Sequence, residues 1–171
     1  MARAGRDEHA WVRGAQAGSA SDLEALFRAY WPRSFRAAYL VVHDSAAAED
    51  IAQEAFLAAI RSLDRFDRRR PFGPWLHRIV VNRAIDWTRA RKLRAEAELD
   101  ESLAADEVPH TFDDGTLAKL SALPPEHRAV IVLRHLLEYT PGEIADLLDL
   151  PRGTVNSRLR RGLDSLAEDL R

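Results

Sequence analysis

The 171-residue sequence lacks cysteine altogether, and only two of its 25 basic residues are lysine. Without cysteine the chain has no disulfide framework, no thiolate zinc site and no cysteine nucleophile, which is typical of the reducing cytoplasm. Its unbroken apolar runs, such as Ala37–Val42, are well short of the roughly 20 residues that cross a bilayer. Asp7 and Glu8 stand where an export signal needs an apolar core. We therefore expect a cytoplasmic protein without direct membrane insertion.

Glycine and proline are scarce, at eight each, and β-branched residues are sparse, whereas alanine and leucine are abundant. This composition favours helices over strands. The content of 46 % hydrophobic and 30 % charged residues is that of a globular chain, and 171 residues allow one domain or two small ones. The sequence predicts an all-α fold.

The net charge of −2 conceals a strong segregation of charge along the chain. Residues 61–94 contain eleven Lys or Arg against three acidic residues, whereas residues 95–115 contain eight acidic residues and no Lys or Arg. Residues 151–162 contain four Arg and no acid. Codon bias explains the choice of arginine over lysine, but not the clustering. Such blocks indicate electrostatic partners or a solvated linker.

Three helical segments are expected in the N-terminal half. A capping box, Ser21–Glu24, starts the first, and Pro32 should kink or interrupt it, leaving two pieces that end at about residue 42. The second segment has Asp44 or Ser45 as its N-cap and runs to about residue 63. The third runs from Pro74, a residue suited to a first helical position, to about residue 91.

The acidic stretch has no sustained apolar period, so we predict a flexible acidic linker over residues 93–115. It separates two small helical domains, residues 1–92 and 116–171. In the second domain, Pro124-Pro125 opens a helix with an apolar run, and two short helices follow at about 141–149 and 151–170.

The last two helices have the pattern of a helix-turn-helix. Thr140–Glu143 is a capping box, and the second helix carries Val155 and Leu159 inward while polar and basic residues lie outside. Short polar groups at a helix start, followed by arginine, suit base edges and phosphates in the major groove. A plain helical hairpin with a solvated arginine face would have the same periodicity. The candidate DNA-contacting residues are Arg152, Thr154, Ser157, Arg158, Arg160 and Arg161.

The N-terminal domain carries a polar stripe and a basic, aromatic cluster. The stripe has helical spacing and consists of Asp50, Gln53, Glu54 and Leu57. The cluster suits single-stranded nucleic acid, because arginine pairs with phosphates and rings stack on bases. Aromatic residues at such spacing equally suit a hydrophobic core. The cluster consists of Phe66, Arg68, Arg69, Arg70, Trp75, Arg78, Asn82 and Asp86.

Four segments together resemble bacterial RNA polymerase sigma factors. Residues 43–57 (HDSAAAEDIAQEAFL) and 72–87 (FGPWLHRIVVNRAIDW) are similar to region two of that family. Residues 123–133 (LPPEHRAVIVL) and 151–162 (PRGTVNSRLRRG) are similar to region four. Two such regions joined by a short linker, without region three, resemble the extracytoplasmic-function group.

The resemblance implies a promoter-specificity subunit for a stress or environmental-response regulon, with core RNA polymerase, promoter DNA and an anti-sigma factor as partners. It implies that the polar stripe binds the β′ clamp helices and that region four meets the β flap. The basic, aromatic cluster would capture a flipped base of the melted minus-ten element. The helix at 151–163 would read the minus-thirty-five element, with Arg158 on a base and Arg160 on phosphate. Phosphates of the minus-ten region would be held by Arg78, Arg83, Arg89, Arg91 and Lys92.

Three alternatives stay open at this stage. The acidic linker either mimics nucleic acid in the RNA path or is a plain tether. The chain could instead be an ordinary DNA-binding regulator, although such a protein needs dimer symmetry rather than a pocket for a melted strand. An enzyme is disfavoured, because the six histidines have no metal-ligand spacing and no phosphate-binding loop or nucleophile elbow occurs. We expect no catalytic residue, no metal and no cofactor.

Overall fold

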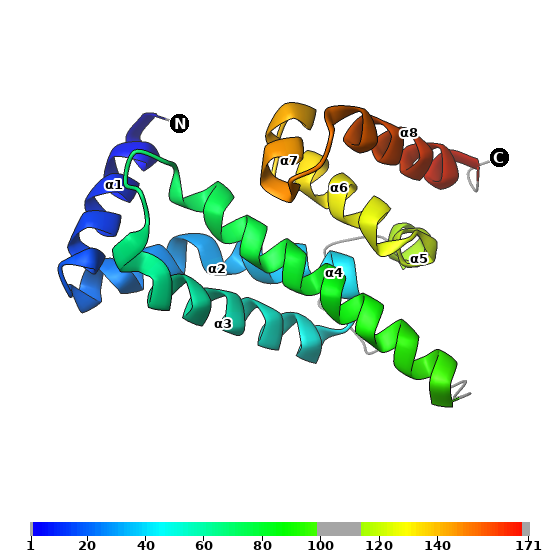
Figure 1. The fold of residues 1–171 in the computed structure, drawn as a ribbon, viewed down its shortest axis with the longest axis horizontal. Coiled ribbons are helices and arrows are strands. Elements are labelled where there is room, and N and C mark those ends of the chain that lie inside the picture. Colours follow the sequence, from blue (N-terminus) through cyan, green and yellow to red (C-terminus); the bar gives the residue numbers. More distant parts are fainter. Residues whose placement is uncertain (1, 99–113, 169–171) are drawn as a thin grey trace.

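The computed structural model describes residues 2–98 and 114–168, and each regular element within these ranges is a helix. The expected all-α fold is therefore confirmed (Figure 1). The N-terminal unit consists of α1 (Ala2–Gln16), α2 (Ala20–Val42), α3 (Ser45–Ser62), the short 3-10 helix η1 (Leu63–Arg65) and α4 (Phe72–Glu98). The C-terminal unit consists of α5 (Asp114–Ala122), α6 (Pro125–His135), α7 (Pro141–Leu148) and α8 (Arg152–Glu168).

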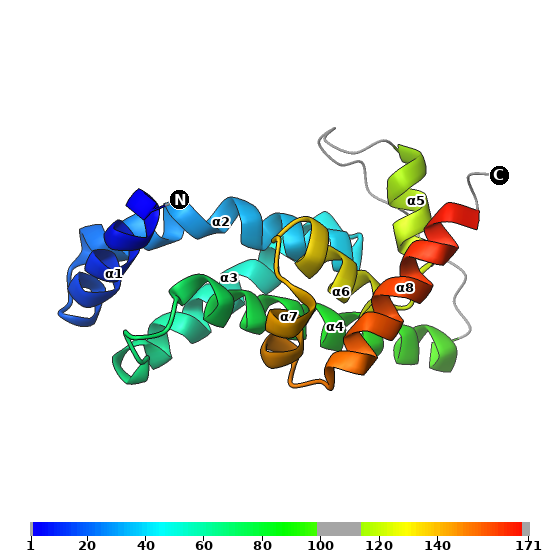
Figure 2. The same cartoon turned by 90° about the horizontal axis from the view of Figure 1, so that it is seen from above.

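Helices α2, α3 and α4 all contact one another and form a three-helix bundle, and α1 packs on α2 at one end of it (Figures 1 and 2). Small buried side chains of α3, among them Ala48, Ala55 and Ala59, let the neighbouring helices approach closely. Helix α3 begins where the sequence predicts, because the side chain of Asp44 accepts a hydrogen bond from the backbone N–H of Ala47 at 2.9 Å.

The helix-turn-helix predicted for the C-terminal unit is present. Both hydrogen bonds of the Thr140–Glu143 capping box form at the start of α7. Asp149 ends α7 in the left-handed conformation, with φ of 55°, a conformation that an Asp side chain tolerates better than most. Helix α8 then buries Val155 and Leu159 against α6 and α7.

The two units pack against each other, an arrangement that the sequence left open. Helix α6 lies between α8 and the bundle of α2, α3 and α4, and it contacts both α2 and α4 (Figure 2). Helix α7 contacts α4. The buried apolar side chains of both units belong to one continuous cluster.

Two expectations for the start and middle of α2 are wrong. The N-cap is Ser19, not Ser21, because Gly18, with φ of 89°, turns the chain after α1 and places the helix start earlier. Pro32 does not divide the helix, which is continuous from Ala20 to Val42. Pro32 has no N–H to donate to the carbonyl four residues before it, but Pro32 is exposed, so water can bind that carbonyl instead. Buried residues on either side of Pro32 hold the helix in place.

The predicted boundaries also shift around the acidic stretch. Helix α4 begins at Phe72, two residues before Pro74, and continues to Glu98. Helix α5 begins at Asp114. Both ends of the predicted 93–115 linker are thus helical, and the prediction for residues 99–113 lies outside the described part of the chain.

Candidate polymerase and nucleic-acid interfaces

The polar stripe of α3 lies on the surface, as its spacing predicts. Asp50, Gln53, Glu54 and Leu57 are all exposed, whereas Ile51 and Ala55 on the other side are buried. Leu57 leaves 49 % of its surface in solvent and Ile60 leaves 41 %, so α3 exposes two large apolar side chains. An exposed apolar side chain among polar ones is the composition of a protein-binding surface.

An apolar groove runs between α2 and α3, next to this stripe. It is lined by Leu23, Phe27, Phe56 and Ile60 among others, and almost all of its lining is hydrophobic. Phe27 and Ile60 remain about two-fifths exposed, and Phe27 stacks on Trp31 with 4.9 Å between ring centroids. The groove extends the exposed apolar surface beyond Leu57.

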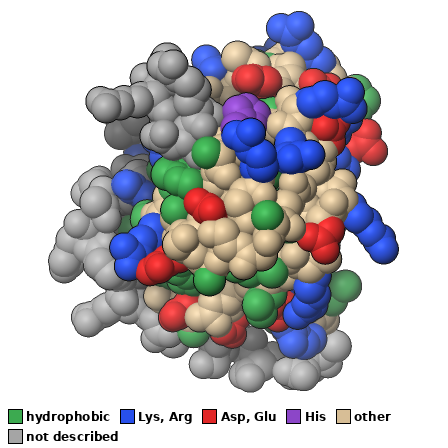
Figure 3. All heavy atoms as spheres, turned by 90° about the vertical axis from the view of Figure 1, so that its left-hand side faces the viewer, with side chains coloured by type: hydrophobic (Ala, Val, Ile, Leu, Met, Phe, Trp, Pro, Cys, Tyr) green, Lys and Arg blue, Asp and Glu red, His purple; other side chains and the backbone are tan. Residues whose placement is uncertain are grey.

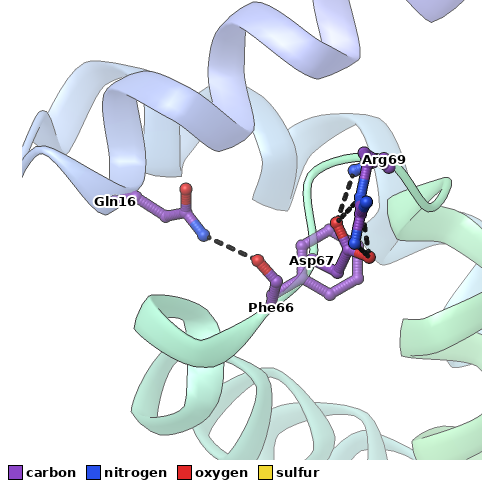
Figure 4. Close-up of polar contacts among 4 residues, drawn as sticks. All are labelled: Gln16, Phe66, Asp67 and Arg69. Atoms are coloured by element: carbon purple, nitrogen blue, oxygen red, sulfur yellow. Dashed lines mark hydrogen bonds and ion pairs between the residues drawn. The ribbon is translucent and has the colours of Figure 1, made fainter.

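The loop after η1 presents its arginines outward but keeps its aromatic residue inside. Phe66 is buried and packs on Trp75, with ring centroids 4.6 Å apart. Arg68, Arg69 and Arg70 are exposed. The guanidinium of Arg69 forms a two-pronged contact with the Asp67 carboxylate (Figure 4). These hydrogen bonds lower the pKa of Asp67.

Helix α4 places the remaining minus-ten candidates along one line. Arg78 and Asp86 are exposed and Asn82 is half-buried between them, while Trp75 is half-buried beside the loop. A polar hollow between α3 and α4 is lined by Asp50, Glu54, Arg83, Asp86 and Trp87. The predicted polymerase stripe and the predicted minus-ten surface therefore meet along this edge.

Three of the arginines expected to hold phosphate are paired with carboxylates. Arg83 donates to Glu54 at 2.7 Å, Arg91 to Asp44 at 3.3 Å, and Arg89 to Glu126 of α6 at 2.7 Å. Although burial alone would raise it, the pKa of Glu126 is lowered by the Arg89 hydrogen bond. On the face shown in Figure 3, which is the left-hand side of Figure 1, the Lys and Arg side chains are spread out rather than gathered in one patch.

The candidate residues of α8 divide by exposure. Arg152, Arg160 and Arg161 are exposed, whereas Thr154, Ser157 and Arg158 are half-buried. Arg158 lies near Glu126 and His127 of α6 and contributes to lowering the pKa of both. The sequence gives no indication of this proximity to α6, so the helical pattern alone predicts the same exposure for Arg158 and Arg160.

Polar contacts between the two units were not foreseen. Arg128 of α6 is buried and donates to the carbonyl of Val41 at 2.6 Å, near the C-terminal end of α2, where a positive charge is favourable. Burial lowers the pKa of Arg128 only to about 10, so it stays charged at neutral pH. His77 of α4 is hydrogen-bonded through Nδ1 to the Tyr139 hydroxyl at 2.7 Å, and burial lowers the pKa of His77 to about 4.

Two family models match the two helical units of the chain. The Sigma-70 region 2 model matches residues 26–94, and the Sigma-70, region 4 model matches residues 116–166. The ECF RNA polymerase sigma factor SigW of Bacillus subtilis is 35 % identical, over 83 % of this chain and 85 % of SigW. The chain belongs to the ECF sigma factors. SigE of Mycolicibacterium smegmatis is also 35 % identical, over 86 % of this chain and 61 % of SigE.

Solved structures of similar shape include CnrH in complex with the cytosolic domain of CnrY. It has a TM-score of 0.73 and 25 % sequence identity, over 96 % of this chain and 97 % of CnrH. The sigma factor RpoE of Bartonella quintana, solved with the anti-sigma factor NepR, has a TM-score of 0.74 at 22 % identity, over 87 % of this chain and 96 % of RpoE, and shares the fold.

As a member of this family, the protein is a sigma factor: it binds core RNA polymerase and directs initiation at promoters. None of the helices in residues 2–98 and 114–168 is long and apolar enough to cross a membrane. Within the same residues, no group of three or more His, Asp or Glu side chains could hold a metal ion.

Proposed function

We propose that this sigma factor divides its work among three surfaces. The exposed stripe of α3 binds the β′ clamp helices, the loop at 66–71 with α4 reads the minus-ten element, and α8 reads the minus-thirty-five element. The C-terminal unit also meets the β flap. The observation that supports this division most strongly is the exposure of Leu57 within an otherwise polar stripe, on a helix whose opposite side is buried.

The division follows the proposed domains, 1–92 for polymerase and minus-ten contacts and 116–171 for the minus-thirty-five element, with 93–115 as the linker. The sigma factor itself carries out no catalysis, since the polymerase forms the phosphodiester bonds. Its place of work is the cytoplasm, where core polymerase and DNA are found. Run-off transcription with purified core polymerase tests the proposal as a whole.

We also propose control by an anti-sigma factor, serving a stress or environmental-response regulon. The apolar groove between α2 and α3 supports this, because it offers a partner helix an apolar seat beside the polymerase-binding stripe. A partner seated there would cover part of the surface that core polymerase needs. CnrH, whose fold is similar to that of this chain, was solved in complex with the cytosolic domain of CnrY. That complex is consistent with such a partner.

The minus-ten assignment predicts that Asn82→Ala relaxes base preference. A half-buried amide on the line from Arg78 to Asp86 can offer both a donor and an acceptor to a flipped base. Losing it should cost about 1–3 kcal/mol of discrimination at one minus-ten position. Transcription from promoters varied one base at a time measures this. Asn156→Ala on α8 is the matched control and should leave the minus-ten profile unchanged; an unchanged profile for Asn82→Ala removes Asn82 from the readout.

The exposure of the α8 arginines supports the opposite assignment of roles to the one expected from the sequence, with Arg160 on a base and Arg158 on phosphate. Arg160 is exposed, so its Ala variant should relax one minus-thirty-five position by about 1–3 kcal/mol. Arg158→Ala should instead weaken binding to all sequences alike, with the salt slope reduced by about one. Holoenzyme binding to single-base promoter variants at several salt concentrations separates the two. The opposite pattern would restore Arg158 as the base reader.

A further inference from the structure

The loop between η1 and α4 is anchored at both ends by side chains of α1. At its start, the Gln16 side-chain amide donates to the carbonyls of Leu63 and Phe66, at 2.8 and 3.1 Å (Figure 4 shows the Phe66 contact). At its end, the carboxylate of Glu8 accepts a hydrogen bond from the backbone N–H of Phe72 at 2.8 Å. Both contacts join residues more than 45 positions apart in the sequence.

The chemistry of each anchor suits its end of the loop. A glutamine amide carries two N–H donors, and the end of η1 offers two carbonyl oxygens, of which that of Leu63 also accepts the backbone N–H of Phe66. At the other end, Phe72 opens α4, where the first N–H groups have no partner within the helix and a negative charge is favourable. Glu8 supplies that charge from another helix.

Helix α1 is itself held firmly against α2, so that its side chains form fixed anchor points. Val12 is buried, and Gly14 lies so close to the Asp22 side chain that a Cβ at this position would collide with it. The Tyr30 hydroxyl donates to the second carboxylate oxygen of Glu8. The Tyr30 ring packs edge-on against the ring of Phe72, with 5.3 Å between the ring centroids. Glu8 is therefore fixed by α2 and by the start of α4 together.

The anchored segment carries the three arginines assigned to the minus-ten element. We propose that Glu8 and Gln16 are positioning residues for minus-ten recognition: they hold the two ends of the 66–71 loop at the spacing needed to receive a flipped base. A loop that is already ordered loses less conformational entropy when the base enters. Both residues lie before the segment that matches region 2, which begins at residue 26. This inference rests on the proposed role of the loop in reading the minus-ten element.

Gln16→Met and Glu8→Met test the proposal, because methionine keeps the length of each side chain but removes the hydrogen-bonding group. We expect each variant to reduce the preference for the best minus-ten base over the worst by about fivefold, the equivalent of one hydrogen bond. Affinity for core polymerase should stay within about twofold, since α3 is untouched. Glu8→Gln, which retains an acceptor for the Phe72 N–H, should restore most of the preference. His9→Met, at an exposed position of the same helix, is the matched control.

The measurement is transcription by full-length holoenzyme from promoters varied at single minus-ten positions, with the melting temperature of each variant recorded. An unchanged preference in both methionine variants would overturn the proposal, as would an equal loss of polymerase binding and of activity at all promoters. Asn82→Ala is assayed alongside. If Asn82→Ala alters the profile but the methionine variants do not, the positioning role fails alone; if none alters it, the proposed minus-ten surface fails as well.

Discussion

Replacing Leu57 with glutamate should weaken binding to core polymerase by at least about tenfold, which corresponds to about 1.4 kcal/mol. A leucine with half of its surface in solvent stabilises the isolated fold little, but in a protein interface its burial is worth more. The glutamate would also place an unpaired negative charge in that interface. The free energy of unfolding should change by less than about 0.5 kcal/mol, the usual range for surface substitutions.

Leu93→Glu provides the matched control, because Leu93 is 67 % exposed on α4, away from the stripe. Equilibrium binding of labelled sigma factor to core polymerase, with a thermal melt of each variant, decides the outcome. Equal weakening by both substitutions would show a general effect of charge. Glu54 is a less direct probe than Leu57, since Glu54→Lys would also break the ion pair with Arg83 and place two cations side by side.

Cross-linking α4 to α6 should abolish promoter-specific transcription. Minus-ten and minus-thirty-five elements lie about 25 base pairs apart, roughly 85 Å at 3.4 Å per base pair. In the compact structure α7 contacts both α4 and α8, so the two reading helices are separated by about 20 Å, two helix-packing distances. We therefore expect the units to separate before both elements are read, which would break the ion pair between Arg89 and Glu126.

Because the natural sequence has no cysteine, a thiol-reactive cross-linker can react only with cysteines that are introduced. Arg89→Cys with Glu126→Cys places thiols across the contact between the units, where the native side chains are 2.7 Å apart. A cleavable thiol-reactive cross-linker should reduce specific transcripts by at least about tenfold, and cleavage should restore them. Glu24→Cys with Arg28→Cys, across one turn of α2, is the control pair and should stay active when cross-linked. Full activity of the cross-linked α4–α6 pair would show that the compact arrangement already reads a promoter.

Local signals explain which parts of the fold were predictable from the sequence. The side chains of Asp44 and Thr140 start their helices by accepting a hydrogen bond from the backbone N–H three residues later, so a short stretch of sequence is sufficient. The wrong expectations for Ser21 and Pro32 depended on the same kind of local rule. There, the turn at Gly18 and the burial of residues around Pro32 outweighed it.

The contacts that organise the site depend on residues far apart in the sequence. Helix α1 carries few large apolar residues, and its packing on α2 and its anchors Glu8 and Gln16 were not predicted from the sequence. Arg128 directly precedes an apolar run, and the sequence does not indicate that its partner is the Val41 carbonyl, 87 positions away. The half-burial of Arg158 likewise depends on α6, which only the folded chain brings beside it.

Run-off transcription tests the central claim most directly. Core polymerase, purified free of other sigma factors, is combined with this protein and a library of promoters randomised at both elements, and the transcripts are sequenced. We predict transcripts from a restricted set of templates sharing one minus-ten and one minus-thirty-five sequence, and none when the protein is left out. Binding to polymerase without such selected transcripts, or no binding at all, would contradict the account.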